Sequence, residues 1–266
     1  MDIYLQGRIL KLPTWSRLCE KNSYKSVENY STLSVILSFT KSHYPGVEPL
    51  MKSLLKNTER SVSFIIQHDS SLERFQVEAI KRRASDVSLI EIQTKAHPYA
   101  HWFCALRNAE VQSSDNVLYI DVDIIVDCSI DDWIHKFNRE FPDALVSGVN
   151  QKNTKDRWEE RNHRHLINTG VVLFKREFFH SKTWSHMKKE VTPEGIVSVR
   201  DDQPYLRDLF EKNKTNVLYA PYRYNINANR VGDERPEGIY HFVGKKKPWQ
   251  NAGAVPLWAM LRKKYV

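Results

Sequence analysis

Hydrophobic residues in the first half of the chain occur in short continuous runs. Each run is followed by a segment in which they recur every three or four positions. Continuous apolar runs bounded by turn residues predict buried strands, and the longer spacing predicts amphipathic helices. The predicted strands are 33–39, 62–66, 87–92 and 116–120. The predicted helices are one that begins near Val47, after a turn at Pro45-Gly46, one that ends near Arg83, and one over 102–111. Strands that alternate with helices predict an α/β fold with a mixed, mainly parallel sheet flanked by helices.

The hydrophobic pattern is less regular in the second half of the chain. The predicted elements there are helices over 130–137 and 202–210, a further helix that ends near residue 189, and strands over 144–149, 166–174 and 216–219. Segment 152–165 is highly charged, so we expect an exposed loop. The composition shows no linker and no internal repeat, which predicts a single domain over 1–266. Within it, we expect residues 1–30 to form a prelude of strand or loop, and 250–266 a basic C-terminal tail.

A pair of aspartates interrupts the hydrophobic stretch YIDVDIIV at 119–126. Residues i and i+2 of a strand share one face, so we expect Asp121 and Asp123 to point the same way and Val122 to point into the core. Two adjacent carboxylates repel each other, and a divalent cation with a preference for oxygen ligands, Mn²⁺ or Mg²⁺, relieves that repulsion. The alternative is a strand end whose aspartates cap a turn. Ligands of parallel sheets bind beyond the carboxyl ends of strands, which favours the metal site.

Charge and composition narrow the possible partners. The formal net charge of +8 favours an anionic partner, such as nucleotide phosphates, nucleic acid or a membrane surface. The three cysteines lack CxxC spacing, which argues against a disulfide framework and a zinc site. The sequence has no apolar run long enough to span a bilayer and no signal-peptide pattern, so we expect a cytoplasmic protein. Trp258, Leu261 and the basic residues of the tail indicate a possible peripheral membrane contact, with a solvated terminal helix as the alternative.

A second chemically informative stretch is HFVGKKKPW, at 241–249. Its glycine permits close approach of the backbone to a ligand, its lysines supply charge for a diphosphate, and its imidazole is an acceptable third ligand for Mn²⁺. Together with YIDVDIIV, LINTGVVLF and DDQPYL, in this order, the stretch resembles the motifs of retaining glycosyltransferases of the GT-A fold, and most of all those of family eight. Every fixed position of the family pattern His-x-x-Gly-x-x-Lys-Pro-Trp is present. The resemblance extends from about Leu33 to Trp249.

The resemblance implies roles for individual residues. Asp121, Asp123 and His241 would hold Mn²⁺, with Mg²⁺ as the alternative, against the diphosphate of a nucleotide-sugar donor. The implied donor contacts are Asn168 at the sugar, Asp202 and Gln203 near the anomeric carbon, Gly244 and Lys247 at the diphosphate, and Arg107 at the sugar-phosphate region. We also consider Tyr44 for stacking on the base, although a surface aromatic is the simpler interpretation. The family usually has an aspartate where this chain has Pro204.

The function implied by the resemblance is transfer of a hexose from UDP-glucose or UDP-galactose to a hydroxyl group, with retention of the anomeric configuration. The acceptor would be a glycan, a lipid-linked glycan or a glycoprotein. An inverting glycosyltransferase is the nearest alternative, with Glu159, Glu160 or Asp201 as the base. A sugar nucleotidyltransferase is less favoured because 39–46 contains one glycine instead of a glycine-rich loop. A nucleic-acid-binding protein fits the charge, but the sequence lacks a recognition-helix stripe and an RNA-binding aromatic signature.

Overall fold

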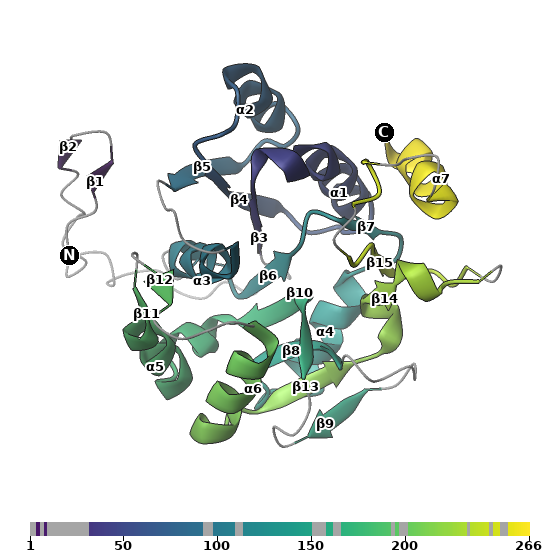
Figure 1. Ribbon diagram of the computed structural model, residues 1–266. Helices are drawn as coiled ribbons and strands as arrows, with labels where there is room; N and C mark the ends of the chain where they lie inside the picture. Colours follow the sequence, from purple (N-terminus) through teal and green to yellow (C-terminus); the bar gives the residue numbers. More distant parts are fainter. Residues whose placement is uncertain are drawn as a thin grey trace, which may run out of the picture.

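An eight-stranded mixed sheet forms the centre of the molecule (Figure 1). The structure is a computed structural model. It describes residues 4–5, 8–9, 32–92, 98–109, 114–150, 158–161, 166–192, 195–196, 202–232, 235–244, 247–250 and 255–266. Along the sheet the strand order is β5 (Val87–Ile92), β4 (Val62–Asp69), β3 (Leu33–Phe39), β6 (Asn116–Ile120), β10 (Ile167–Lys175), β8 (Val146–Asn150), β13 (Val217–Ala220) and β9 (Glu159–Arg161). The first four strands are mutually parallel, and β10 runs antiparallel to both of its neighbours. The predicted α/β fold with a mainly parallel sheet is confirmed.

Helices cover both faces of this sheet because successive side chains of each strand point to opposite sides. Val35 and Leu37 of β3 belong to one buried cluster, and Ile36 belongs to the other. The first cluster includes residues of α1 (Tyr44–Lys56), α2 (Arg74–Lys81) and α4 (Asp131–Arg139). The second includes residues of α3 (Pro98–Ala109), α5 (Lys182–Glu190) and α6 (Asp202–Asn213). The result is a three-layer arrangement of helix, sheet and helix.

A small three-stranded sheet joins the C-terminal part of the chain to the centre of the molecule. It has the order β14 (Ile226–Asn227), β15 (Ile239–His241) and β7 (Ile124–Val126). Helix α7 (Pro256–Tyr265) packs on this sheet through Trp258 and Leu261, which are buried with Ile125 and Phe242. The remaining strands are the short pairs β1 (Tyr4–Leu5) with β2 (Arg8–Ile9) and β11 (Val191–Thr192) with β12 (Gly195–Ile196).

The structure corrects three of the local predictions. Pro45 and Gly46 form no turn between elements but lie in the first turn of α1, where a proline is tolerated because its missing N–H is not needed. Within the predicted loop 152–165, Glu159–Arg161 forms strand β9, because it pairs with the edge of β13. The predicted basic tail contains helix α7, whose apolar side is buried. Residues 1–30 lie outside the described residues except for the β1–β2 pair.

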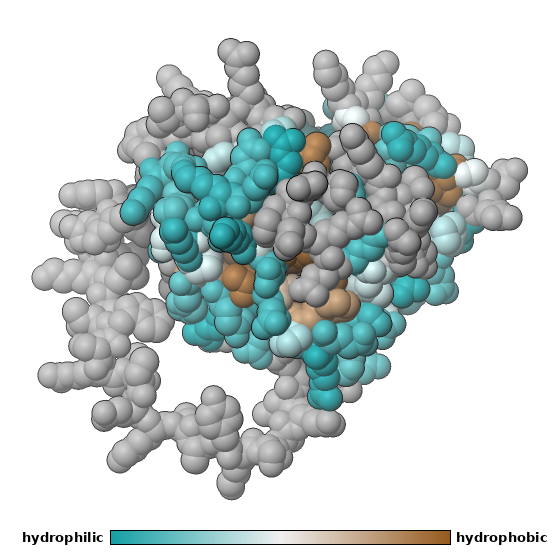
Figure 2. Space-filling model, turned by 90° about the horizontal axis from the view of Figure 1, so that it is seen from below, coloured by the Kyte–Doolittle hydropathy of each residue, from teal (hydrophilic) through white to brown (hydrophobic). Residues whose placement is uncertain are grey.

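The exposure of hydrophobic residues tests the expected peripheral membrane contact. The side of the molecule shown in Figure 2 is mainly hydrophilic over the described residues, and the hydrophobic residues on it lie in small groups. The expectation required Trp258 and Leu261 at the surface, whereas both are buried. Among the described residues, we find no helix with the length and the apolar character needed to cross a bilayer.

Candidate functional site

The two aspartates of the hydrophobic stretch lie in the turn that connects β6 to β7. The predicted strand 116–120 is confirmed as β6, but the strand alternation assumed for the two aspartates does not apply, because β6 ends at Ile120. Backbone hydrogen bonds hold the turn on both sides: the N–H of Asp121 donates to the carbonyl of Gly170 at 2.8 Å, and the carbonyl of Asp123 accepts from the N–H of Phe242 at 2.9 Å. Val122 is buried, as predicted. The turn therefore fixes the two carboxylates at the carboxyl end of a central strand.

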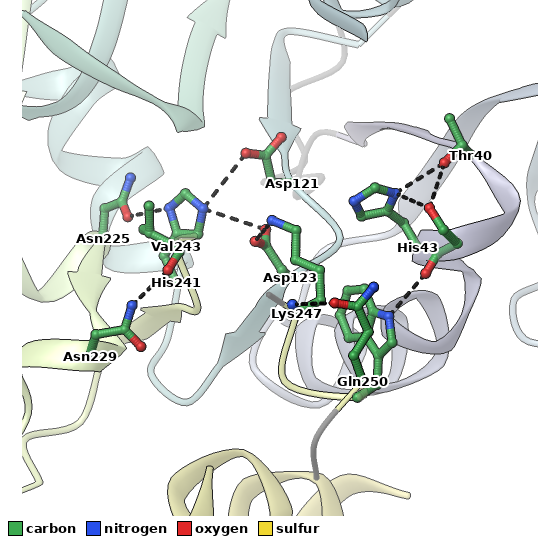
Figure 3. A network of polar contacts seen from close by, with 12 residues as sticks. Thr40, His43, Asp121, Asp123, Asn225, Asn229, His241, Val243, Lys247 and Gln250 are labelled. Carbon is green, nitrogen blue, oxygen red and sulfur yellow. Dashed lines mark hydrogen bonds and ion pairs between the residues drawn. The ribbon is translucent and has the colours of Figure 1, made fainter. Parts of the chain in front are cut away.

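His241 meets both carboxylates (Figure 3). Its Nε2 atom lies 3.7 Å from Oδ2 of Asp121 and 3.4 Å from Oδ1 of Asp123. One ligand atom from each of the three residues can be chosen so that all lie within 4.8 Å of one another. The antiparallel pairing of β15 with β7 produces this arrangement, because it places His241 opposite Ile124. The side chain of Asp123 is 5% exposed and that of Asp121 37%, so the cluster opens to solvent on the Asp121 side.

The electrostatics of the cluster match a cation site. Burial, followed by repulsion from Asp123, raises the pKa of Asp121. Burial also opposes ionisation of Asp123, but the hydrogen bond and charge of His241 and the charge of Lys247 outweigh it and lower the pKa of Asp123 to about 2. Two carboxylate oxygens and one imidazole nitrogen form a donor set that suits Mn²⁺ and accommodates Mg²⁺ less well. The residues present therefore fit a divalent cation.

The close packing of His241 on the backbone of Gly170 explains why the motif LINTGVVLF contains a glycine at this position. A Cβ atom at this position would lie 2.1 Å from Cε1 and 2.6 Å from Nδ1 of His241, and 3.0 Å from Oδ2 of Asp121. The imidazole thus packs directly on the backbone of β10, at a distance that only a residue without a side chain permits. Asn168, two residues earlier, accepts the N–H of Gly170 at 3.0 Å through its Oδ1 atom.

Two residues that the sequence analysis did not select complete the surroundings of the cluster. Oδ1 of Asn225 lies 3.1 Å from Nδ1 of His241, and Asn225 is buried. The hydroxyl of Tyr119 donates to Oδ1 of Asp121 at 2.9 Å. The negative charge of Asp202 contributes to raising the pKa of Tyr119, after burial and Asp121. Tyr119 stands within the aspartate motif, whereas no sequence signal that we recognised marks Asn225.

Lys247 and the turn after β3 form the other side of the site (Figure 3). Nζ of Lys247 lies 2.6 Å from Oδ2 of Asp123. Nε1 of Trp249 donates to the carbonyl of Ser42 at 3.0 Å, which holds the C-terminal motif against the start of α1. His43 packs edge-on against Trp249, and burial together with the positive charge of Lys247 lowers the pKa of His43. The sequence analysis missed His43, although its position directly after a parallel strand was an available signal.

Comparison with known proteins identifies the family. The family model described as "Glycosyl transferase family 8" matches residues 34–253 of this chain. The chain belongs to glycosyltransferase family 8. The match confirms the predicted family and, for this region, the predicted enzyme class, a glycosyltransferase.

Comparison with individual similar proteins establishes the fold. Glycosyltransferase GlyA of Streptococcus pneumoniae serotype 4 (strain ATCC BAA-334 / TIGR4) is 23% identical over 265 residues, which are 95% of this chain and 36% of that protein. The chain thus spans about a third of the length of this curated relative. The galactosyltransferase LgtC, solved in complex with donor and acceptor sugar analogs, is similar with a TM-score of 0.58 and 16% identity, over 88% of this chain and 96% of that chain. GlyE of S. pneumoniae TIGR4 is similar with a TM-score of 0.57 and 17% identity, over 87% of this chain and 62% of that chain. These similarities confirm the predicted GT-A fold.

The other residues selected by resemblance to family 8 lie at different places around the cluster. Gln203 follows Asp202 at the start of α6, and its backbone N–H donates to the Oδ1 atom of Asp202 at 2.9 Å. Gly244 has a φ of +138°, which favours glycine, and its side is open: a Cβ atom there would have no neighbour within 4 Å. Arg107 donates to the carbonyl of Lys188 at 2.7 Å, which directs at least part of its guanidinium toward α5. Tyr44 lines a separate pocket with Glu48, Arg83 and Arg262. The roles of these residues stay predictions.

Proposed function

We propose that this protein transfers a hexose from UDP-glucose or UDP-galactose to a hydroxyl group of a glycan, a lipid-linked glycan or a glycoprotein, with retention of the anomeric configuration. The observation that carries the proposal is the cluster of Asp121, Asp123 and His241, whose ligand atoms lie within 4.8 Å of one another at the carboxyl end of β6. Membership of family 8 supports the reaction class. These three residues would hold a divalent cation, Mn²⁺ by preference, which would supply positive charge for the departing nucleoside diphosphate.

The residues around the cluster supply the donor contacts in this proposal. Lys247 binds the diphosphate after leaving Asp123, and Gly244 lets the backbone approach the same phosphates. Asn168 binds the sugar hydroxyls. Arg107 and Tyr44 remain proposed contacts of the sugar phosphate and the base, and Arg107 would have to turn from its present partner, the carbonyl of Lys188. Each of these contacts orients the anomeric carbon relative to the acceptor hydroxyl, and such orientation contributes a large part of the rate enhancement.

Retention of the anomeric configuration restricts which side chain can assist the reaction at the anomeric carbon. The transition state of glycosyl transfer resembles an oxocarbenium ion, and a double displacement requires a nucleophile on the face opposite the leaving group. Gln203 is a poor nucleophile because its amide is uncharged. We therefore propose front-face attack by the acceptor hydroxyl, with its proton passing to the departing phosphate. Asp202, buried at the start of α6, accepts the backbone N–H of Gln203 and orients this first turn of the helix. Unchanged turnover in Gln203→Ala would remove this residue from the site.

The experiment that tests the function is the release of nucleoside diphosphate from a panel of nucleotide sugars, with Mn²⁺ and with EDTA. Hydrolysis of the donor by water requires no known acceptor. We expect release from one UDP-hexose that EDTA abolishes and that Asp123→Ala lacks. Asp208→Ala is the matched control, because its carboxylate is 64% exposed and pairs with Arg207 on the surface of α6. Metal-independent release, or equal loss in both variants, would contradict the proposal.

The stereochemical part requires a product with a defined anomeric centre. With a simple sugar as acceptor, the anomeric proton of the new linkage distinguishes retention from inversion by NMR. An inverted product would favour the inverting alternative, for which Glu159 on β9 is the candidate base with a described side chain. The other two candidates are Glu160, whose side chain is not described, and Asp201, which lies outside the described residues.

A further inference from the structure

A chain of hydrogen bonds connects the backbone of β10 to the imidazole of the metal site. The N–H of Gly170 donates to Oδ1 of Asn168 at 3.0 Å. The same oxygen accepts from Nδ2 of Asn225 at 3.1 Å, and Oδ1 of Asn225 lies 3.1 Å from Nδ1 of His241. Asn225 and His241 are each 5% exposed, so water offers these groups few alternative partners. Figure 3 shows Asn225 behind the imidazole, on the side away from the two aspartates.

This chain of hydrogen bonds has only one consistent direction. A backbone N–H always donates, so the atom of Asn168 that faces Gly170 is the oxygen. An oxygen needs a donor opposite it, which fixes the NH₂ group of Asn225 toward Asn168 and the oxygen of Asn225 toward His241. That oxygen can only accept, so Nδ1 of His241 carries a proton. In a neutral imidazole with a proton on Nδ1, the lone pair lies on Nε2, the atom that faces Asp121 and Asp123.

We infer that Asn225 is a positioning residue that fixes the tautomer and ring orientation of His241 as a metal ligand, and that it couples this ligand to Asn168 at the sugar side of the site. The inference rests on the proposed function. Metal-binding histidines need a partner for their second nitrogen, and loss of such a partner typically costs about 10- to 100-fold in metal affinity. The side-chain amide of Asn225 also donates through its NH₂ group to Asn168. Asn225 therefore positions both the proposed metal ligand His241 and the proposed donor contact Asn168.

Position 225 offers two substitutions with different consequences. Asn225→Leu has a similar volume and removes both hydrogen bonds. Asn225→Asp keeps an oxygen that accepts from Nδ1 of His241 but replaces the NH₂ group by an oxygen that faces Oδ1 of Asn168. A matched control is Asn116→Leu: Asn116 is buried at the opposite end of β6 and exchanges two amide hydrogen bonds with Asn138, at 3.1 and 2.7 Å. This control removes a comparable polar pair far from the cluster.

The test measures Mn²⁺ affinity in the presence of UDP by the EPR signal of free Mn²⁺, together with the nitrogen hyperfine coupling of the bound ion and the thermal midpoint. We expect Asn225→Leu to bind Mn²⁺ about 10- to 100-fold more weakly, with an altered nitrogen coupling. Asn225→Asp should retain the affinity and the coupling while KM for the donor rises, because only the Asn168 end is lost. Asn116→Leu should lower the thermal midpoint and leave both metal readouts unchanged. If Asn225→Leu does not fold, Asn225→Ser, whose hydroxyl is too short to reach Nδ1, serves the same comparison.

The outcomes separate this inference from the proposed function. Equal Mn²⁺ affinity and nitrogen coupling in wild type and Asn225→Leu would overturn the role of Asn225 and leave the metal site intact. Equal weakening in Asn225→Leu and Asn225→Asp would also overturn it, because general damage to the fold would then explain both. A wild-type protein that binds no Mn²⁺ with UDP and releases no diphosphate would overturn the proposed function, and the role of Asn225 with it.

Discussion

Substitution of Gly170 by alanine tests whether the packing of His241 on β10 creates the metal site. The new Cβ would lie 2.1 Å from Cε1 of His241, whereas ordinary contacts begin at 3.4 Å, so the two atoms must separate by about 1.3 Å. The backbone of Gly170 cannot retreat easily, because its carbonyl accepts from Asp121 and its N–H donates to Asn168. The imidazole is confined in turn by Asn225 at 3.1 Å and Asp123 at 3.4 Å. One of the three ligands must therefore leave its position.

The expected effect has two parts of different size. Strain from an inserted methyl group in a packed interior typically costs about 1–3 kcal/mol, which lowers the thermal midpoint by about 2–4 °C per kcal/mol in a chain of this size. Displacement of a metal ligand by more than 1 Å should weaken Mn²⁺ binding by about 100-fold or more, since loss of a partner outside the ligand shell alone costs about 10- to 100-fold. Calorimetric titration of Mn²⁺ in the presence of UDP, with a thermal melt of the same sample, measures both parts.

Two other glycines serve as controls. In Gly148→Ala the Cβ meets Cγ2 of Ile167 at 2.5 Å, so this variant carries a similar clash in the same sheet, but against a side chain that is not one of the three ligands. In Gly232→Ala the Cβ has no neighbour within 4 Å. We expect Gly148→Ala to lose stability and retain Mn²⁺ affinity, and Gly232→Ala to retain both. Wild-type Mn²⁺ affinity in Gly170→Ala would refute the reasoning, and so would an equal loss of affinity in Gly148→Ala.

Three further predictions concern the charges at the site. The carboxylates raise the pKa of His241 above 6.5 in spite of its burial, so a bound proton must leave before Nε2 can bind a cation. Mn²⁺ affinity should therefore rise by up to about tenfold per pH unit below the raised pKa of His241 and level off above it. Calorimetric titrations in buffers of different ionisation enthalpy would detect the proton that binding releases. In Lys247→Met, Mn²⁺ no longer competes with Nζ for Asp123, so the variant should bind Mn²⁺ alone about fivefold more tightly. Its KM for the donor should rise, because the lysine no longer contacts the diphosphate. Weaker binding of Mn²⁺ alone would contradict this prediction. Tyr119→Phe removes one hydrogen bond to Asp121 and should cost about 1 kcal/mol in Mn²⁺ binding by calorimetry, with an unchanged affinity as the contrary result.

Local patterns in the sequence determined most of the first half of the fold and the candidate metal ligands. The runs at 33–39 and 116–120 coincide with β3 and β6, because a strand buried on both faces requires nearly continuous apolar residues. The run at 87–92 coincides with β5, an edge strand that is half-buried. The segment at 62–66 is the start of β4, which continues to Asp69 because parallel pairing with β3 and β5 extends past the apolar run. Asp121, Asp123 and His241 were recognisable because two carboxylates in a hydrophobic stretch require a compensating charge.

Only the tertiary structure decided how these ligands are held. Asn225 and Gly170 act on His241 through contacts between β10, the residue before β14, and β15, and no spacing within one segment encodes a contact between three segments. The two aspartates lie in a turn and do not follow the strand alternation that we assumed, although their carboxylates converge as expected. The turn takes its course from the hydrogen bond that the N–H of Asp121 donates to Gly170 and the one that the carbonyl of Asp123 accepts from Phe242. The sequence by itself therefore determined which groups provide charge and ligand atoms. Packing between distant segments decided their orientation, since direction depends on partners that come together only in the folded chain.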